Sequence, residues 1–247
     1  MSVGNFNLKN MVLFSNSLPK SGSTLLYCLQ REFLYGVSEK SINDDNYLLE
    51  RAGVASCGGF LSNDNLDSLA SYLLDNEVLD GPYVFKIHSP LTGNLQNLFF
   101  KKFNVFISLS IRDPLDMLLS AHDNYYKTGE FSSFQCLENG CKTINTWFQR
   151  IYDTCINNDN ERIVPVVRYE QIVSNPMQAI YNSFDDALMR MIFYAVADKY
   201  LNLKQAYNGS SHRLGPSNNN RDSIKQSEEF LTCKKELSEF RKKLGYE

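Results

Sequence analysis

MVLFSNSLPKSGSTLLY, residues Met11 to Tyr27, combines a predicted strand, a turn and the start of a predicted helix. The apolar run Met11–Ser15 predicts a buried strand, and the pattern is helical from Leu25 to Phe33. A short polar turn with one proline and one glycine lies between them. This order favours a phosphate-binding site. The first N–H groups of a helix have no partners inside the helix, and the helix dipole makes that end positive.

The turn itself contains groups that bind anions. Lys20 adds a full positive charge, and Gly22 lets the backbone approach a ligand closely. Ser21, Ser23 and Thr24 add hydroxyl donors. The P-loop motif G-x-x-x-x-G-K-[ST] is not matched, because the lysine here precedes the only glycine of the turn. Taken alone, the turn is also compatible with an ordinary corner between a strand and a helix.

The composition is that of an ordinary globular protein. The chain has 247 residues, 43% hydrophobic and 21% charged, which suits one domain over residues 1–247. A net charge of −3 argues against nucleic acid or an anionic membrane as a partner. The six cysteines lack the spacing of a metal site, and no apolar run approaches the roughly 20 residues that span a bilayer. We therefore expect free thiols, no metal and a soluble, cytoplasmic protein.

Predicted strands alternate with predicted helices along the chain. The strands are Met11–Ser15, Tyr83–Ile87, Asn104–Ile111 and Ile163–Arg168. The helices are Leu25–Phe33, Leu66–Leu79, Leu91–Lys102, Pro114–Lys127, Asn139–Ile156, one that begins at Asn175-Pro176, Asp185–Leu203 and Glu228–Leu244. Polar segments cover 36–65, with short helical pieces, and 207–227. This alternation predicts an α/β fold of three layers, with helices on both faces of a central parallel sheet of about four to five strands. Ligands of such sheets bind beyond the carboxyl ends of the strands, where the polar motifs lie.

A second motif, RDPLDMLLS at Arg112–Ser120, follows the predicted strand Asn104–Ile111. Arg112 lies at the strand end and Ser120 on the next helix, so a guanidinium and a hydroxyl could hold one anion between them. The alternative is that Arg112 forms an ion pair with Asp113 or Asp116 and only stabilises the start of the helix.

A third motif, FKIHSPL at Phe85–Leu91, places a histidine just past a strand end and close to Lys86. His88 is the best candidate for a general base, because an unperturbed histidine titrates near neutral pH. The alternative is a hydrogen-bonded structural histidine. His122 and His212, the other two histidines, have no neighbours that suggest a metal site.

Two segments nearer the C-terminus are less informative. Val167–Ile172, VRYEQI, is expected to serve mainly in packing and turn formation. Arg213 and Gly215 lie in the polar segment 207–227, where Arg221 and Lys225 are alternative cations. A solvated loop without a ligand is the other interpretation of this segment.

Together these motifs resemble the cytosolic-type sulfotransferases, which use 3′-phosphoadenosine 5′-phosphosulfate (PAPS). The order P-K-S-G-[ST]-T resembles the family's 5′-phosphosulfate loop, and R-D-P-x-D-x-x-x-S resembles its 3′-phosphate motif. The run Phe85–Leu91 is similar to the family's K-T-H-x-P, with isoleucine in place of threonine. Of the closing R-K-G and G-D-W elements, only Arg213 and Gly215 fit. The resemblance covers Val12 to about Ile180, and more loosely extends to Gly215.

The resemblance implies a P-loop-nucleotide-kinase-like sulfotransferase fold with a nucleotide-binding core over 11–180. It implies that the cofactor-binding residues are Lys20, Ser21, Gly22, Ser23, Thr24, Arg112, Ser120, Arg213 and Gly215, with Arg112 and Ser120 on the 3′-phosphate. His88 would be the general base, Lys86 would support the sulfuryl group, and Lys20 would stabilise the leaving phosphate. The acceptor would be a hydroxyl or amine of a small molecule or glycan, bound near 36–65 and 205–227.

Two other functions remain open, and so does the oligomeric state, monomer or homodimer. One is a nucleotide or small-molecule kinase on a similar α/β fold. The other is a protein that binds PAPS, or its product 3′-phosphoadenosine 5′-phosphate (PAP), without catalysis.

Overall fold

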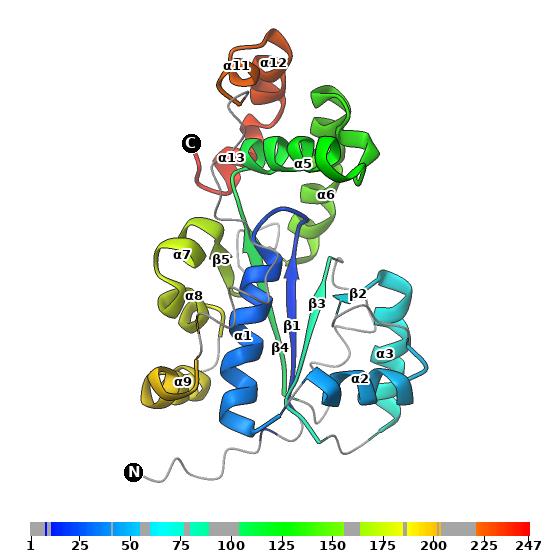
Figure 1. Ribbon diagram of the computed structural model, residues 1–247, viewed down its shortest axis with the longest axis vertical. Coiled ribbons are helices and arrows are strands. Elements are labelled where there is room, and N and C mark those ends of the chain that lie inside the picture. The colour runs from blue at the N-terminus through cyan, green and yellow to red at the C-terminus, as the bar shows by residue number, and fades with distance from the viewer. Residues whose placement is uncertain are drawn as a thin grey trace.

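A parallel sheet forms the centre of the molecule (Figure 1). The computed structural model describes residues 8, 11–40, 42–54, 60–76, 80–88, 104–155, 164–184, 187–201, 203 and 221–247. Within them, five parallel strands pair in the order β2-β3-β1-β4-β5. They are β1 (Met11–Ser17), β2 (Phe60–Leu61), β3 (Tyr83–Ile87), β4 (Asn104–Ile111) and β5 (Val166–Arg168). The α/β class and the parallel sheet predicted from the sequence are confirmed.

Helices cover both faces of this sheet, and β1 lies at its centre. Met11 and Leu13 belong to one apolar cluster and Val12 and Phe14 to another, as the two-residue period of a strand requires. The first cluster includes residues of α1 (Ser23–Ser38), α7 (Tyr169–Ser174), α8 (Pro176–Asn182) and α9 (Ala187–Tyr200). The second includes residues of α2 (Ile42–Arg51), α3 (Asn63–Asp75), α5 (Pro114–Thr128), α6 (Leu137–Cys155), α12 (Glu228–Glu236) and α13 (Ser238–Lys243). The continuous apolar run of β1 therefore suits a strand that is buried on both faces.

Local signals explain where α5 begins and ends. The Asp113 carboxylate accepts a hydrogen bond of 2.9 Å from the backbone N–H of Leu115 and so caps the helix. Pro114 occupies the first turn, where its missing N–H removes no helical hydrogen bond. Gly129 ends the helix in the left-handed conformation, with φ at 73°. The arginine that precedes this cap is thereby held at the junction of β4 and α5.

Two segments differ from the sequence prediction. The segment 36–65 contains α2, one of the short helical pieces expected there, and also β2, an unpredicted strand that is too short for a periodic pattern to reveal. The predicted helix Glu228–Leu244 is two helices, α12 and α13, which meet at the fully buried Leu237. The chain has no glycine or proline near that break, so the sequence contains no signal for it.

Other boundaries shift, and two short helices appear that the sequence did not predict. β5 begins at Val166, later than the predicted start at Ile163. The short helices α11 (Arg221–Lys225) and η2 (Ser132–Phe134) were not predicted. The predicted helix Leu91–Lys102 and most of the polar segment 207–227 lie outside the described residues.

The carboxyl ends of β1, β3 and β4 lie side by side. Asn16 pairs with Ile87 of β3, and Ser17 pairs with Ser110 of β4. The turn after β1, the histidine after β3 and the arginine after β4 therefore lie at one edge of the sheet, as the sequence predicted. In the ranges that the structure describes, no helix is long and apolar enough to cross a bilayer.

Candidate anion-binding site

The turn after β1 has an unusual backbone. Lys20 has φ at 66° and Gly22 has φ at 86°, so a lysine and a glycine both adopt the left-handed conformation. For a residue with a side chain this conformation costs roughly 1–2 kcal/mol, and such strain is concentrated at functional sites. Helix α1 begins at Ser23, and no acidic residue lies in its first turn. Its N-terminus is therefore positive and has no carboxylate of its own to compete with a bound anion.

The ring of Tyr169 leaves no room for a side chain at Gly22. A Cβ atom at Gly22 would lie 2.5 Å from Cδ2 of Tyr169. The Arg112 guanidinium lies over the same ring, 4.2 Å from its centroid. Tyr169 thus lies against both the turn between β1 and α1 and the guanidinium of Arg112. From the sequence, the segment Val167–Ile172 was expected to serve mainly in packing and turn formation. Nothing in the sequence indicated these two contacts of Tyr169.

The hydroxyl of Ser21 helps to build the turn. It donates a hydrogen bond of 2.7 Å to the Leu18 carbonyl and lies 3.1 Å from the Ser110 hydroxyl, and the residue is fully buried. The backbone N–H of Ser21 donates to the same carbonyl at 3.3 Å. Ser21 therefore fixes the turn against β4, and its predicted role as a donor to an anion stays a prediction.

Two lysines lie near the start of α1. Lys86, on β3, donates a hydrogen bond of 2.8 Å to the Thr24 hydroxyl, which joins the strand to the helix. Burial lowers the pKa of Lys86, and the charge of Lys20 lowers it further. Burial likewise lowers the pKa of Lys20, whose Nζ lies 5.4 Å from the centroid of the Phe131 ring. Two partly desolvated cations that repel one another are a favourable setting for an anionic ligand.

His88 is held by the end of β1. Its Nδ1 lies 2.7 Å from the Ser17 carbonyl oxygen and 3.1 Å from the Ser17 hydroxyl. Because a carbonyl only accepts, the proton of the neutral ring is assigned to Nδ1, and Nε2 is the basic nitrogen. Burial, with a contribution from Lys86, lowers the pKa of His88 to about 4, although the Ser17 carbonyl opposes the shift. His88 is therefore neutral at pH 7, the protonation state a general base needs.

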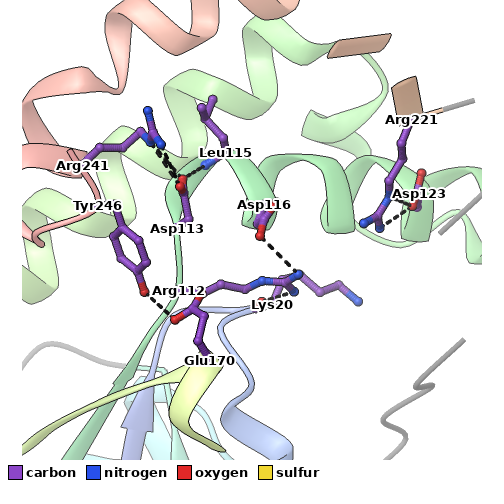
Figure 2. A network of polar contacts seen from close by, with 10 residues as sticks. All are labelled: Lys20, Arg112, Asp113, Leu115, Asp116, Asp123, Glu170, Arg221, Arg241 and Tyr246. Carbon is purple, nitrogen blue, oxygen red and sulfur yellow. Dashed lines mark hydrogen bonds and ion pairs between the residues drawn. The ribbon is translucent and has the colours of Figure 1, made fainter. Parts of the chain in front are cut away.

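Arg112 makes only weak contacts with its acidic neighbours (Figure 2). Its Nη2 lies 3.8 Å from the Asp116 carboxylate, and its Nη1 lies 3.5 Å from the Lys20 carbonyl. Its Nε is buried and has no hydrogen-bond partner among the described residues. Asp113 does not pair with Arg112, since it accepts hydrogen bonds from Arg241. Of the pairings considered from the sequence, only the one with Asp116 is present, and it is a long contact.

Ser120 lies on the same stripe of α5 as the acidic partner of Arg112. Asp116 and Ser120 are four residues apart, and Asp123 follows three residues later, so all three lie along one face. The Ser120 hydroxyl makes no hydrogen bond with any residue that the structure describes. Arg221 of α11 pairs with Asp123 at 2.5 Å (Figure 2), which brings one of the alternative cations to this face. The predicted residues Arg213 and Gly215 lie outside the described residues.

The edge of the sheet brings together groups that suit an anionic ligand: the N-terminus of α1, Lys20, Lys86 and Arg112. No group of three or more histidine, cysteine, aspartate or glutamate side chains that could hold a metal ion occurs in the described ranges. A scan against protein-family models finds no match for this chain, and a search of curated proteins finds no significant match.

Proposed function

We propose that the chain is a sulfotransferase that moves the sulfuryl group of PAPS to a hydroxyl or amine of a small-molecule or glycan acceptor. The observation that carries the proposal is the convergence of three separate motifs at one edge of the sheet. Lys20, Lys86 and Arg112 supply positive charge there, and His88 supplies a neutral base. The resemblance of the motifs supports a sulfotransferase version of this α/β fold.

Two anion sites fit the two ends of the cofactor. The first is the N-terminus of α1 with Lys20 and the Thr24 hydroxyl, which suits a 5′-phosphosulfate. The second is the face of α5 between Arg112 and Ser120, which suits a 3′-phosphate. The buried, unpartnered Nε of Arg112 supports this second assignment, because a buried donor left without an acceptor is unfavourable.

His88, Lys86 and Lys20 would each have a separate role in the sulfuryl transfer. Nε2 of His88 would accept the proton of the acceptor as the acceptor oxygen or nitrogen forms its bond to sulfur. Lys86 would balance charge on the sulfuryl oxygens. Lys20 and the N–H groups of α1 would stabilise the negative charge left on the 5′-phosphate when its oxygen–sulfur bond breaks. As in phosphoryl transfer, catalysis would consist of positioning and electrostatic stabilisation of an in-line displacement.

A low pKa at His88 is compatible with this role. A base with a pKa of about 4 is neutral at pH 7 but binds protons weakly. A cofactor with several negative charges, bound beside the ring, would raise that pKa towards the working pH. The base would then be strongest only when the donor is in place.

Transfer from radiolabelled PAPS to pooled phenols, aliphatic alcohols, amines and sugars would test the proposal. Production of PAP together with a labelled acceptor is the expected result. Transfer of phosphate from ATP to the same pool would instead support the kinase alternative. Binding of PAP without turnover on any acceptor class would favour the non-catalytic alternative.

A further inference from the structure

Arg241 of α13 holds the aspartate that follows Arg112. Its Nε lies 3.1 Å and 3.2 Å from the two carboxylate oxygens of Asp113, and its Nη2 lies 2.9 Å from one of them (Figure 2). Both side chains are mostly buried, with 13% of Arg241 and 18% of Asp113 exposed. Arg241 also pairs with Glu247 through Nη1. A bidentate pair of this kind, shielded from solvent, fixes both charge and orientation.

The charge of Asp113 matters because of where it lies. It is the direct neighbour of Arg112, one proposed ligand of a 3′-phosphate, and it caps the helix that holds Ser120, the other. An uncompensated carboxylate there would repel a phosphate and would compete for the Arg112 guanidinium. Arg241 of α13 removes both effects, because it neutralises the Asp113 carboxylate and donates hydrogen bonds to it.

The same segment fixes the residues on either side of Tyr169. Arg168 donates hydrogen bonds to the carbonyls of Leu244, at 2.6 Å, and Gly245, at 3.2 Å. The Tyr246 hydroxyl donates to the Glu170 carboxylate at 3.0 Å (Figure 2). The segment 241–247 therefore contacts both the start of α5 and the start of α7, which are the two elements that hold Arg112 and the ring on which it stacks.

We propose that Arg241 is a positioning residue for the 3′-phosphate of the nucleotide. It neutralises Asp113 and thereby leaves the Arg112 guanidinium directed to the ligand. This inference rests on the proposed function, in which Arg112 and Ser120 bind that phosphate.

The test compares the variants Arg241→Gln, Asp113→Asn and the double variant by calorimetric binding of two ligands. The ligands are PAP and adenosine 5′-phosphosulfate, which has no 3′-phosphate. Arg241→Gln should weaken PAP binding about tenfold and leave the second ligand within about twofold. Asp113→Asn keeps a helix-capping side chain and should bind PAP as the wild type does. In the double variant, PAP affinity should return to within about threefold of the wild type, because the charge that needed neutralising is gone.

Two further variants distinguish an effect of charge on PAP affinity from an effect on folding. Lys242→Gln makes the same charge change on the same helix at an exposed position and should leave PAP affinity unchanged. Arg241→Lys keeps the charge without the bidentate geometry and should keep most of the affinity if Arg241→Gln proves too unstable to measure.

The possible failures are distinguishable. Equal weakening of both ligands by Arg241→Gln, or no recovery in the double variant, would show that Arg241 only stabilises the fold and would overturn this inference alone. Failure of the wild-type protein to bind PAP would overturn the proposed function and this inference with it.

Discussion

At the scale of single residues, the site combines cations that repel one another with a histidine that burial keeps neutral. The two lysines have lowered pKa values, and His88 has a pKa of about 4. The sequence predicted these residue types and their positions after the strands. It could not predict that Asp113 pairs with Arg241, because the two are 128 residues apart in the chain. That distant contact is the one from which we infer a positioning role for Arg241.

Replacement of His88 by alanine tests its role as the base. His88→Ala should lower the transfer rate by about 10²–10⁴-fold, the range for loss of a general base, while PAP affinity stays within a few fold. His122→Ala is a matched control, since Nδ1 of His122 also lies 2.8 Å from a backbone carbonyl, that of Phe134. Near-normal turnover in His88→Ala, measured with labelled PAPS and a responsive acceptor, would show that another group takes the proton.

The pH dependence of stability tests the environment of His88. Its folded pKa of about 4 is below the unfolded value near 6.5, so between these values the unfolded chain binds more protons. The contribution of His88 to stability should therefore fall as the pH falls from about 6.5 to about 4, by about 2–3 kcal/mol near pH 4.5. Asp45, whose pKa burial raises to about 7, acts in the opposite direction. The difference between wild type and His88→Asn in urea unfolding isolates the histidine, and a difference that does not change with pH would contradict its burial.

At the scale of elements, long apolar runs were predicted well and short or interrupted ones were not. The bounds of β3 and β4 are those predicted, because each is a run rich in apolar residues. The two residues of β2 are too few for a periodic pattern. The break between α12 and α13 lies at the fully buried Leu237, and no glycine or proline near it signals the break. The turn between β1 and α1 was recognisable because glycine, lysine and hydroxyl residues occur together there.

Replacement of Gly22 tests the contact between that turn and α7. Gly22→Ala must adopt φ near 86° and also place a methyl group 2.5 Å from the Tyr169 ring. Gly53→Ala is the matched control, because Gly53 has φ at 66° but no atom within 4 Å of an added Cβ. Gly22→Ala should lose about 1–3 kcal/mol more stability than Gly53→Ala in denaturant unfolding, and it should bind PAP less tightly. Equal losses for the two variants would show that Tyr169 moves away easily.

At the scale of the whole molecule, the fold gathers charge that the composition does not reveal. The chain has a net charge of −3, yet the ends of β1, β3 and β4 bring Lys20, Lys86 and Arg112 to one edge of the sheet. The segment 241–247 then fastens the start of α5 to the start of α7 on the same side (Figure 2). The class of fold and this edge were predictable from the alternation of strands and helices. The contacts of the segment 241–247 with α5 and α7 were not predictable, because they join distant parts of the chain.

The most direct test of the central claim is thermal stability with PAP, ADP, or ATP with Mg²⁺. A ligand at about 100 times its dissociation constant adds about 2.7 kcal/mol to stability, which gives an easily measured shift. We expect PAP to stabilise the wild-type protein, ADP and ATP to do so much less, and Arg112→Ala to lose the response to PAP. Stabilisation by ATP with Mg²⁺ but not by PAP would contradict the account, because it would assign the site to a kinase.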